Sequence, residues 1–208
     1  MREAKLMGMT GHSMSTASPN AASARTILFD LQVEQHEHDE VYHREIARLP
    51  LHQRLNHMAL HFAKYSGKIA AAADDAALAA VFTDVLIIAV SSANILNQEL
   101  SALLVGDPGQ HSTLLGFGRA AALTGGDIVS DRNLLLRETS IAAGRIAAAC
   151  EKIDHLEDIS YRTEFSLGIK RLAELSLAVL ARHGVDPAYA VRHRLSDVRK
   201  RLKLHGRI

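Results

Sequence analysis

The stretch His57-Met-Ala-Leu-His-Phe-Ala-Lys-Tyr-Ser-Gly-Lys-Ile-Ala70 predicts a helix with two contrasting faces. Apolar residues in and just before it recur at the three- and four-residue spacing of a helix. They are Leu55, Ala59, Phe62, Ala63 and Ile69. His57, His61, Lys64 and Lys68 form one narrow stripe opposite this apolar set. We expect the apolar face to pack into a core, and the cationic face either to be solvated or to line an anion site.

The composition of the whole chain agrees with a helical protein. Its 208 residues are rich in alanine and leucine, with no tryptophan and only four prolines. The formal net charge of +1 does not indicate a general nucleic-acid surface. The single cysteine, Cys150, cannot form an intrachain disulfide and fits a reducing cytoplasm. We therefore expect a cytoplasmic protein in which Cys150 is a small core residue.

The most apolar segment, residues 85–96, is interrupted by Ser91, Ser92 and Asn94 and begins beside Asp84. A membrane span needs ~20 predominantly apolar residues, so we expect a buried helix and no membrane contact. Asp84 is the only ionisable residue between Asp75 and Glu99. A carboxylate in such a helix needs a cation, a metal or hydrogen-bond donors. Lys64 and Lys68 on the preceding helix are its natural partners.

The order of the segments predicts an all-α helical bundle. Residues 1–23 lack periodicity and are expected to be a disordered tail, and residues 24–208 a single all-α domain. The glycine-rich segment Gly116 to Asp127 is expected to be a linker. Gly184-Val-Asp-Pro187 is a helix stop followed by a new start. Helices are expected over about residues 26–48, 51–73, 76–97, 130–152, 161–183 and 187–204.

The first expected helix is densely ionisable in its middle. His36, His38 and His43, together with Glu34, Asp39 and Glu40, could hold a metal. Two pairs have the four-residue spacing that helical metal ligands use, namely Glu34 with His38 and Asp39 with His43. The more ordinary interpretation is a charged, solvent-facing helix, because His36 and His38 lie on different sides.

The second half of the chain repeats a pattern of the first. Gly67-Lys-Ile-Ala-Ala-Ala matches Gly144-Arg-Ile-Ala-Ala-Ala, so that Lys68 corresponds to Arg145. Two helical hairpins of similar pattern indicate two pseudo-repeats, at about residues 50–105 and 128–204. A chance match between alanine-rich helices is the alternative.

At this level the chain resembles the all-α nucleoside triphosphate pyrophosphatases of the MazG and dimeric dUTPase type, over most of residues 40–204. Leu60-His-Phe-Ala-Lys-Tyr-Ser-Gly-Lys-Ile69 is similar to the family's Leu-x-x-x-Glu-Glu-x-Gly-Glu-Leu. Asp84-Val-Leu-Ile-Ile-Ala-Val-Ser-Ser-Ala-Asn94 resembles the following apolar helix, which begins at an aspartate and ends in Ala-Asn. Leu180-Ala-Arg-His-Gly-Val-Asp-Pro187, before a basic helix, resembles the family's ending. The resemblance implies a bundle built from two MazG-like hairpins plus flanking helices.

The chain departs from the family at the metal-binding signature, Glu-Glu-x-x-Glu followed by Glu-x-x-Asp. Lys64, Tyr65 and Lys68 stand at the first group, and of the second group only Asp84 is an acid. In the second hairpin the corresponding basic residues are Arg145 and, near the late aspartate, Arg171. Mg²⁺ needs hard oxygen ligands, which lysine cannot supply. Candidates for phosphate binding or ion pairing are therefore Lys64, Lys68, Asp84, Asn94, Arg145 and Arg171.

The leading functional hypothesis is a MazG-like protein that has lost metal-dependent pyrophosphohydrolase activity. It would bind a nucleotide or phosphorylated small molecule in a regulatory or assembly role, as a homo-oligomer, with no metal or other cofactor. The alternative is an active nucleotide pyrophosphohydrolase, or another metal-dependent hydrolase, using Mg²⁺ or a transition metal on relocated ligands. Those ligands would be His57, His61 and Asp84, with His38, Asp39 and His43. Nucleic-acid binding through the basic C-terminal helix is not favoured, because the total charge is balanced.

Overall fold

The computed structural model describes residues 22–201, which form helices and contain no strand. The predicted all-α helical bundle is therefore confirmed for this part of the chain. The expected tail lies outside the described residues except for its last two, Ala22 and Ser23. The elements are α1 (Ala24–Tyr42), α2 (Arg44–Ala47), α3 (Leu51–Ala71), α4 (Asp75–Ile95), α5 (Leu100–Leu103), η1 (Pro108–Gln110), α6 (Leu114–Gly125), η2 (Gly126–Val129), α7 (Arg132–Asp154), α8 (Tyr161–Arg182) and α9 (Pro187–Arg201).

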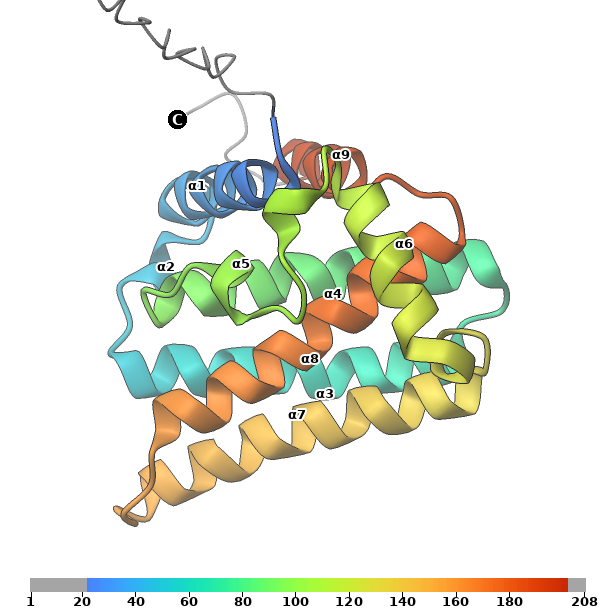
Figure 1. The fold of residues 1–208 in the computed structure, drawn as a ribbon. Coiled ribbons are helices and arrows are strands. Elements are labelled where there is room, and N and C mark those ends of the chain that lie inside the picture. Colours follow the sequence, from blue (N-terminus) through green and yellow to red (C-terminus); the bar gives the residue numbers. More distant parts are fainter. Residues whose placement is uncertain (1–21, 202–208) are drawn as a thin grey trace, which may run out of the picture.

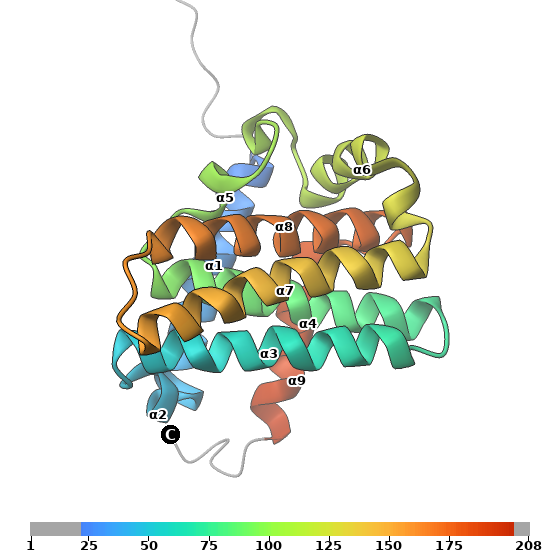
Figure 2. The same cartoon turned by 90° about the horizontal axis from the view of Figure 1, so that it is seen from below.

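Four long helices form the centre of the molecule as two antiparallel hairpins, α3–α4 and α7–α8 (Figure 1). Helix α3 packs against α4 and α7, and helix α8 packs against the same two helices (Figure 2). Each helix of the bundle thus has two neighbours, as in other four-helix bundles. The buried apolar residues from α1 through α9 join into one continuous core.

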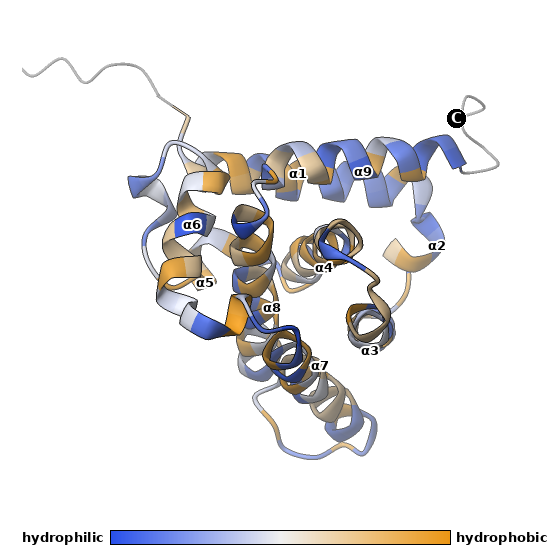
Figure 3. Ribbon diagram, turned by 90° about the vertical axis from the view of Figure 1, so that its right-hand side faces the viewer, coloured by the Kyte–Doolittle hydropathy of each residue, from blue (hydrophilic) through white to orange (hydrophobic). Residues whose placement is uncertain are grey.

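Helices α1 and α9 lie next to each other over α4, on the side of α4 that faces away from α7 (Figure 3). Each contributes a narrow apolar stripe, which on α9 consists of Val191 and Leu195. The outward side of α9 is hydrophilic (Figure 3). These two helices therefore cover the outer side of α4, and the polar residues on that side of α4 contact α1 and α9.

Helix α4 is apolar almost all round, and other helices therefore cover it on several sides. Asp74 caps its N-terminus by accepting a hydrogen bond from the backbone N–H of Ala77, at 2.8 Å. Among the described residues it is the one helix long and apolar enough to cross a membrane, and most of its apolar residues are buried inside the protein. The apolar composition of α4 is thus explained by its burial in the core of this protein.

The end of α8 confirms the predicted helix stop. Gly184 has a φ of 69°, the left-handed conformation that glycine adopts without strain. Its N–H donates to the carbonyl of Ala181 at 3.1 Å, and the N–H of Val185 donates to the carbonyl of Leu180 at 2.9 Å. This pair of bonds is a Schellman motif, and Pro187 then begins α9.

Two boundary predictions were wrong. The segment Gly116 to Asp127 is not a linker, because most of it belongs to helix α6, which is capped by the Thr113 hydroxyl. Glycine is a poor helix former, but here it permits a close approach, since α6 packs on α8 at Gly118. The helix expected through Arg48 is interrupted at His43, whose φ of −130° and ψ of 35° are not helical. The burial of Cys150 agrees with its predicted place in the core.

The packing of α6 on α8 can be tested at Gly118. Gly118→Ala should lower the free energy of unfolding by about 1–3 kcal/mol, because overpacking forces the backbones apart. The added Cβ would lie 2.5 Å from the carbonyl oxygen of Leu177 and 2.9 Å from the Cβ of Ala181. The matched control is Gly144→Ala on α7, where no such atom lies within 4 Å. The control should gain about 0.5–1 kcal/mol, because alanine favours the helix; urea unfolding that shows equal effects would contradict this packing.

Candidate functional site

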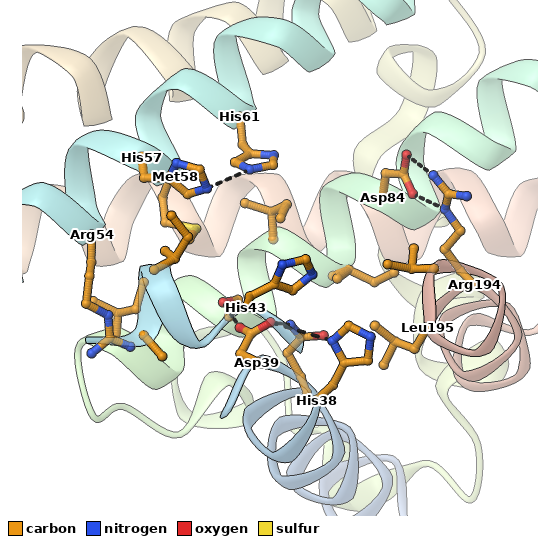
Figure 4. Close-up of a pocket in the computed structure, with 18 of the residues that line it drawn as sticks. His38, Asp39, His43, Arg54, His57, Met58, His61, Asp84, Arg194 and Leu195 are labelled. Carbon is orange, nitrogen blue, oxygen red and sulfur yellow. Dashed lines mark hydrogen bonds and ion pairs between the residues drawn. The ribbon is translucent and has the colours of Figure 1, made fainter. Parts of the chain in front are cut away.

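A cavity of about 410 Å³ lies beside α4, with walls from α1, α2, α3, α4 and α9 (Figure 4). Its size falls within the range of small-molecule sites. One part of the wall is apolar and consists of Met58, Ile87, Ile88, Ile95, Leu195 and Val198. The rest carries four histidines, three acids (Asp39, Glu45 and Asp84) and two arginines, which give the cavity its chemical character.

Asp84 is held by Arg194 of α9 in a two-point ion pair. The guanidinium donates to the carboxylate at 2.6 Å from Nε and at 3.1 Å from Nη2 (Figure 4). The Asp84 side chain is only 12% exposed, so this pair is largely screened from water. The hydrogen bond to Asp84 raises the pKa of Arg194 above its ordinary value. Both oxygens of the carboxylate are thus engaged, as the fork geometry of arginine allows.

The two lysines of α3 lie outside this fork. Lys68 Nζ is 4.0 Å from Asp84 Oδ2, and its side chain is 49% exposed. Lys64 Nζ lies 2.9 Å from Nδ1 of His61 and 4.6 Å from the centre of the Tyr65 ring. Burial and the charge of Lys68 lower the pKa of Lys64. The lysines therefore add positive charge near Asp84 and His61, while the guanidinium provides the direct contact with Asp84.

His57 and His61 project from α3 into the cavity, as their four-residue spacing on one face implies (Figure 4). Their Nε2 atoms lie 3.1 Å apart, which is a hydrogen-bond distance when one ring donates and the other accepts. Burial, followed by the charge of Lys64, lowers the pKa of His61 to about 4. The same causes lower the pKa of His57. His61 is therefore a neutral imidazole at neutral pH, the form that can accept a proton or bind a metal.

A second histidine group lies on the opposite wall, where α1 ends (Figure 4). His38, Asp39 and His43 each offer one ligand atom, and these atoms all lie within 4.8 Å of one another. The rings of His38 and His43 have centroids 5.4 Å apart. The interruption of the helix at His43 makes this possible, because five residues along a continuous helix would turn the two rings to different faces.

The Asp39 carboxylate is oriented by neighbouring donors. The Gln35 amide donates to Oδ1 at 2.8 Å, and the Ser91 hydroxyl of α4 donates to Oδ2 at 2.8 Å. Burial opposes ionisation, but the interactions with His38, Gln35 and Ser91 outweigh it and lower the pKa of Asp39. Asp39 is therefore an ionised carboxylate within a largely apolar cavity.

The remaining candidates from the sequence lie elsewhere. Asn94 joins α4 to α1, because its side chain accepts from Gln32 Nε2 at 2.9 Å and donates to the Gln32 carbonyl at 2.8 Å. Arg145 lies 3.7 Å from Glu164, and Arg171 lies 2.8 Å from Glu138, on the α7–α8 hairpin. The six phosphate-binding candidates are thus divided among three places, and only Asp84 lines the cavity.

Sequence reasoning did not single out Arg54 or Arg194 as residues of the site. The pairing of Asp84 with Arg194 spans 110 residues, so no local spacing reveals it. A signal was nevertheless present in α9, where Val191, Leu195 and Val198 recur at helical spacing and define the inward face. Arg194 borders that face, which made it the basic residue to examine.

Comparisons with protein-family models, curated proteins and solved structures give no match to this chain. Asp84 is a poor Mg²⁺ ligand here, because a guanidinium forks onto both of its oxygens and its positive charge opposes a nearby cation. The donors on Asp39, in contrast, are a neutral amide and a neutral hydroxyl. The ionised Asp39 and the ring of His38, whose nitrogens have no hydrogen-bond partner among the described residues, are available for a ligand that enters the cavity.

The partner of Asp84 can be identified by double-mutant cycles. Asp84→Asn with Arg194→Met should show a coupling energy of about 1–3 kcal/mol, because each single change leaves a partly buried charge unpaired. Asp84→Asn with Lys68→Met should show less than ~0.5 kcal/mol, because that pair is long and half exposed. Denaturant unfolding measures both cycles. A larger coupling to Lys68 than to Arg194 would overturn this arrangement.

The low pKa of His61 predicts a pH dependence of stability. Its pKa is about 4 in the folded protein and 6.5 for an unperturbed imidazole. Between these values the unfolded chain binds a proton that the folded protein does not, so stability falls as the pH drops from 6.5 toward 4. His61→Gln should make this fall less steep in urea unfolding, whereas His36→Gln, at an exposed position of α1, should not. An NMR titration midpoint for His61 near 6.5 would contradict the prediction.

Proposed function

We propose that this chain is a MazG-like helical protein that has lost metal-dependent nucleoside triphosphate pyrophosphohydrolase activity. Its cavity then binds a nucleotide or another phosphorylated small molecule. The observation that carries the proposal is the commitment of Asp84 to Arg194. Asp84 is the one acid that matches the family's metal-binding signature, and a guanidinium now supplies the positive charge beside it. Phosphoryl transfer depends on the positive charge of metal ions that such acids bind. We therefore expect that the pyrophosphohydrolase activity is lost when this acid is paired with an arginine.

Arg54 supports the binding of an anionic ligand. It lines the cavity from α3, and its Nε is buried without a hydrogen-bond partner among residues 22–201. An unpaired buried donor is costly, and a phosphate oxygen would satisfy it. Neutral imidazoles can donate further hydrogen bonds, and the apolar wall offers a surface for the non-phosphate part of the ligand.

The two hairpins support the resemblance to a duplicated unit. The residues matched by the repeat, Lys68 and Arg145, each approach an acid on the following helix of their own hairpin. The distances are 4.0 Å from Lys68 to Asp84 and 3.7 Å from Arg145 to Glu164. We include in the proposal that the two hairpins descend from one MazG-like unit. A regulatory or assembly role as a homo-oligomer, in the cytoplasm, stays a prediction.

A second candidate function is favoured by one specific observation. All six relocated ligands expected from the sequence line the same cavity, although they come from α1, α3, α4 and the break at His43. A metal-dependent hydrolase using these histidines and aspartates is therefore the alternative. Asp84 would contribute least to it, because Arg194 already occupies the carboxylate.

Nucleotide turnover and nucleotide binding test the proposal separately. With Mg²⁺ and a panel of NTPs and dNTPs, the protein should release no more pyrophosphate than Asp84→Ala does. A phosphorylated ligand that binds the folded protein should raise its melting temperature. At a ligand concentration 100 times Kd, the free energy of unfolding should increase by about 2.7 kcal/mol. Arg54→Ala should abolish this shift, whereas Arg137→Ala, at an exposed position of α7, should keep it.

Two outcomes would end the proposal. One is robust Mg²⁺-dependent turnover that disappears in Asp84→Ala, because Asp84 would then still act as a metal ligand. The other is a thermal shift that is the same in Arg54→Ala and in the unaltered protein, because the ligand would then bind outside this cavity.

A further inference from the structure

We propose that His38, Asp39 and His43 form a binding site for one divalent transition-metal ion at the end of α1. The site consists of two imidazoles and one carboxylate, whose ligand atoms lie within 4.8 Å of one another. The inference concerns ion binding alone and does not depend on the function proposed above. It rests on three observations, namely the unpaired state of His38, the prearranged Asp39 and the break in the helix.

His38 is the most informative of the three residues. Its side chain is 6% exposed, and both ring nitrogens are buried without a hydrogen-bond partner among the described residues. The nearest acid, Asp39, is 3.7 Å from Nδ1, which is beyond hydrogen-bond distance. A buried imidazole that satisfies neither nitrogen loses its hydration without compensation. A metal ion bound to one nitrogen would offset the part of that cost that belongs to this nitrogen.

Asp39 already has the surroundings of a metal ligand. Gln35 and Ser91 hold its two oxygens at 2.8 Å each and fix the plane of the carboxylate. Such outer contacts orient ligands in metal sites and contribute to their affinity. Each oxygen keeps a second lone pair free for an ion. The negative charge of Asp39 would balance only one of the two positive charges of a divalent ion, so the occupied site would keep a net positive charge. His61 on the facing wall is neutral and adds no further positive charge.

The helix break brings the third ligand into place. Because α1 stops at Tyr42, the His43 ring turns back toward His38 instead of following the helix (Figure 4). The N–H of His43 donates to the Asp39 carbonyl at 2.9 Å, which fixes the backbone at the break. Bonds of ~2.0–2.2 Å to a tetrahedral ion require the ligand atoms to lie closer together than 4.8 Å, so side-chain rotations would accompany binding.

The ligand set indicates the class of metal. Two imidazoles and one carboxylate suit zinc, iron or cobalt rather than Mg²⁺ or Ca²⁺, which prefer all-oxygen ligands. Three protein ligands leave further coordination positions open toward the cavity, as in metal sites that bind a water or a ligand. His57 and His61 on the facing wall are hydrogen-bonded to each other, and the proposed site does not need them as direct ligands.

The test uses the full chain without a histidine tag, stripped with a chelator and titrated with Co²⁺ alone. We expect one Co²⁺ per chain, with visible absorption bands that Zn²⁺ displaces. His38→Gln and His43→Gln should each weaken binding by more than the ~10–100-fold expected for an outer contact, and Ser91→Ala should fall within that range. His36→Gln is the matched control, because it removes an exposed histidine from the same helix and should leave the affinity unchanged.

X-ray absorption at the cobalt edge identifies the ligands in the unaltered protein, so this test does not depend on variants that could fail to fold. It should show two imidazoles and oxygen ligands. The proposal is overturned by binding that is absent or not stoichiometric in the unaltered protein, by a spectrum with four imidazoles, or by folded His38→Gln protein that keeps full affinity. It is also overturned if His36→Gln weakens binding as much as His38→Gln does, because the ion would then lie on the surface.

Discussion

The arrangement depends on the burial of α4, a helix that is apolar on nearly every side. Such a helix is stable in water only when other helices cover it all round. Helices α3 and α8 cover it from within the bundle, and α1 and α9 cover it from outside. The same burial constrains Asp84, because a carboxylate in this position must be compensated. The guanidinium of Arg194 compensates it, and the pair also ties α9 to the bundle.

The cavity follows from how the outer helices meet the bundle. Helix α1 ends at Tyr42, His43 is not helical, and the short α2 follows; residues of all three segments line the space beside α3. Apolar side chains line part of that space, and the polar groups gather on the facing walls of α1 and α3 (Figure 4). The interruption of one helix thus places the His43 ring near that of His38 at the wall of this space.

Burial and neighbouring groups together determine the charge of His61 and Asp39 in this cavity. The imidazole of His61 loses its affinity for a proton because it is buried near Lys64. Asp39 keeps its negative charge in spite of burial, because donors converge on it. Asp84 is matched by a permanent cation. The cavity therefore combines the neutral imidazole of His61 with the buried, ionised carboxylate of Asp39, which has no lysine or arginine partner among the described residues. This combination differs from a magnesium site made of acids.

The sequence by itself determined most of the long helices, since apolar spacing and capping residues act over a few neighbours, but it did not predict α5, α6 or the break at His43. It predicted the α3–α4 and α7–α8 hairpins, the stop at Gly184 and the shared face of His57 and His61. Local rules failed at Gly118, where packing on α8 overrides poor helix propensity. Only the tertiary structure decided that Arg194 binds Asp84 and that His38, Asp39 and His43 face α3 across one cavity. These contacts depend on how helices distant in the chain cross, and no local spacing encodes that.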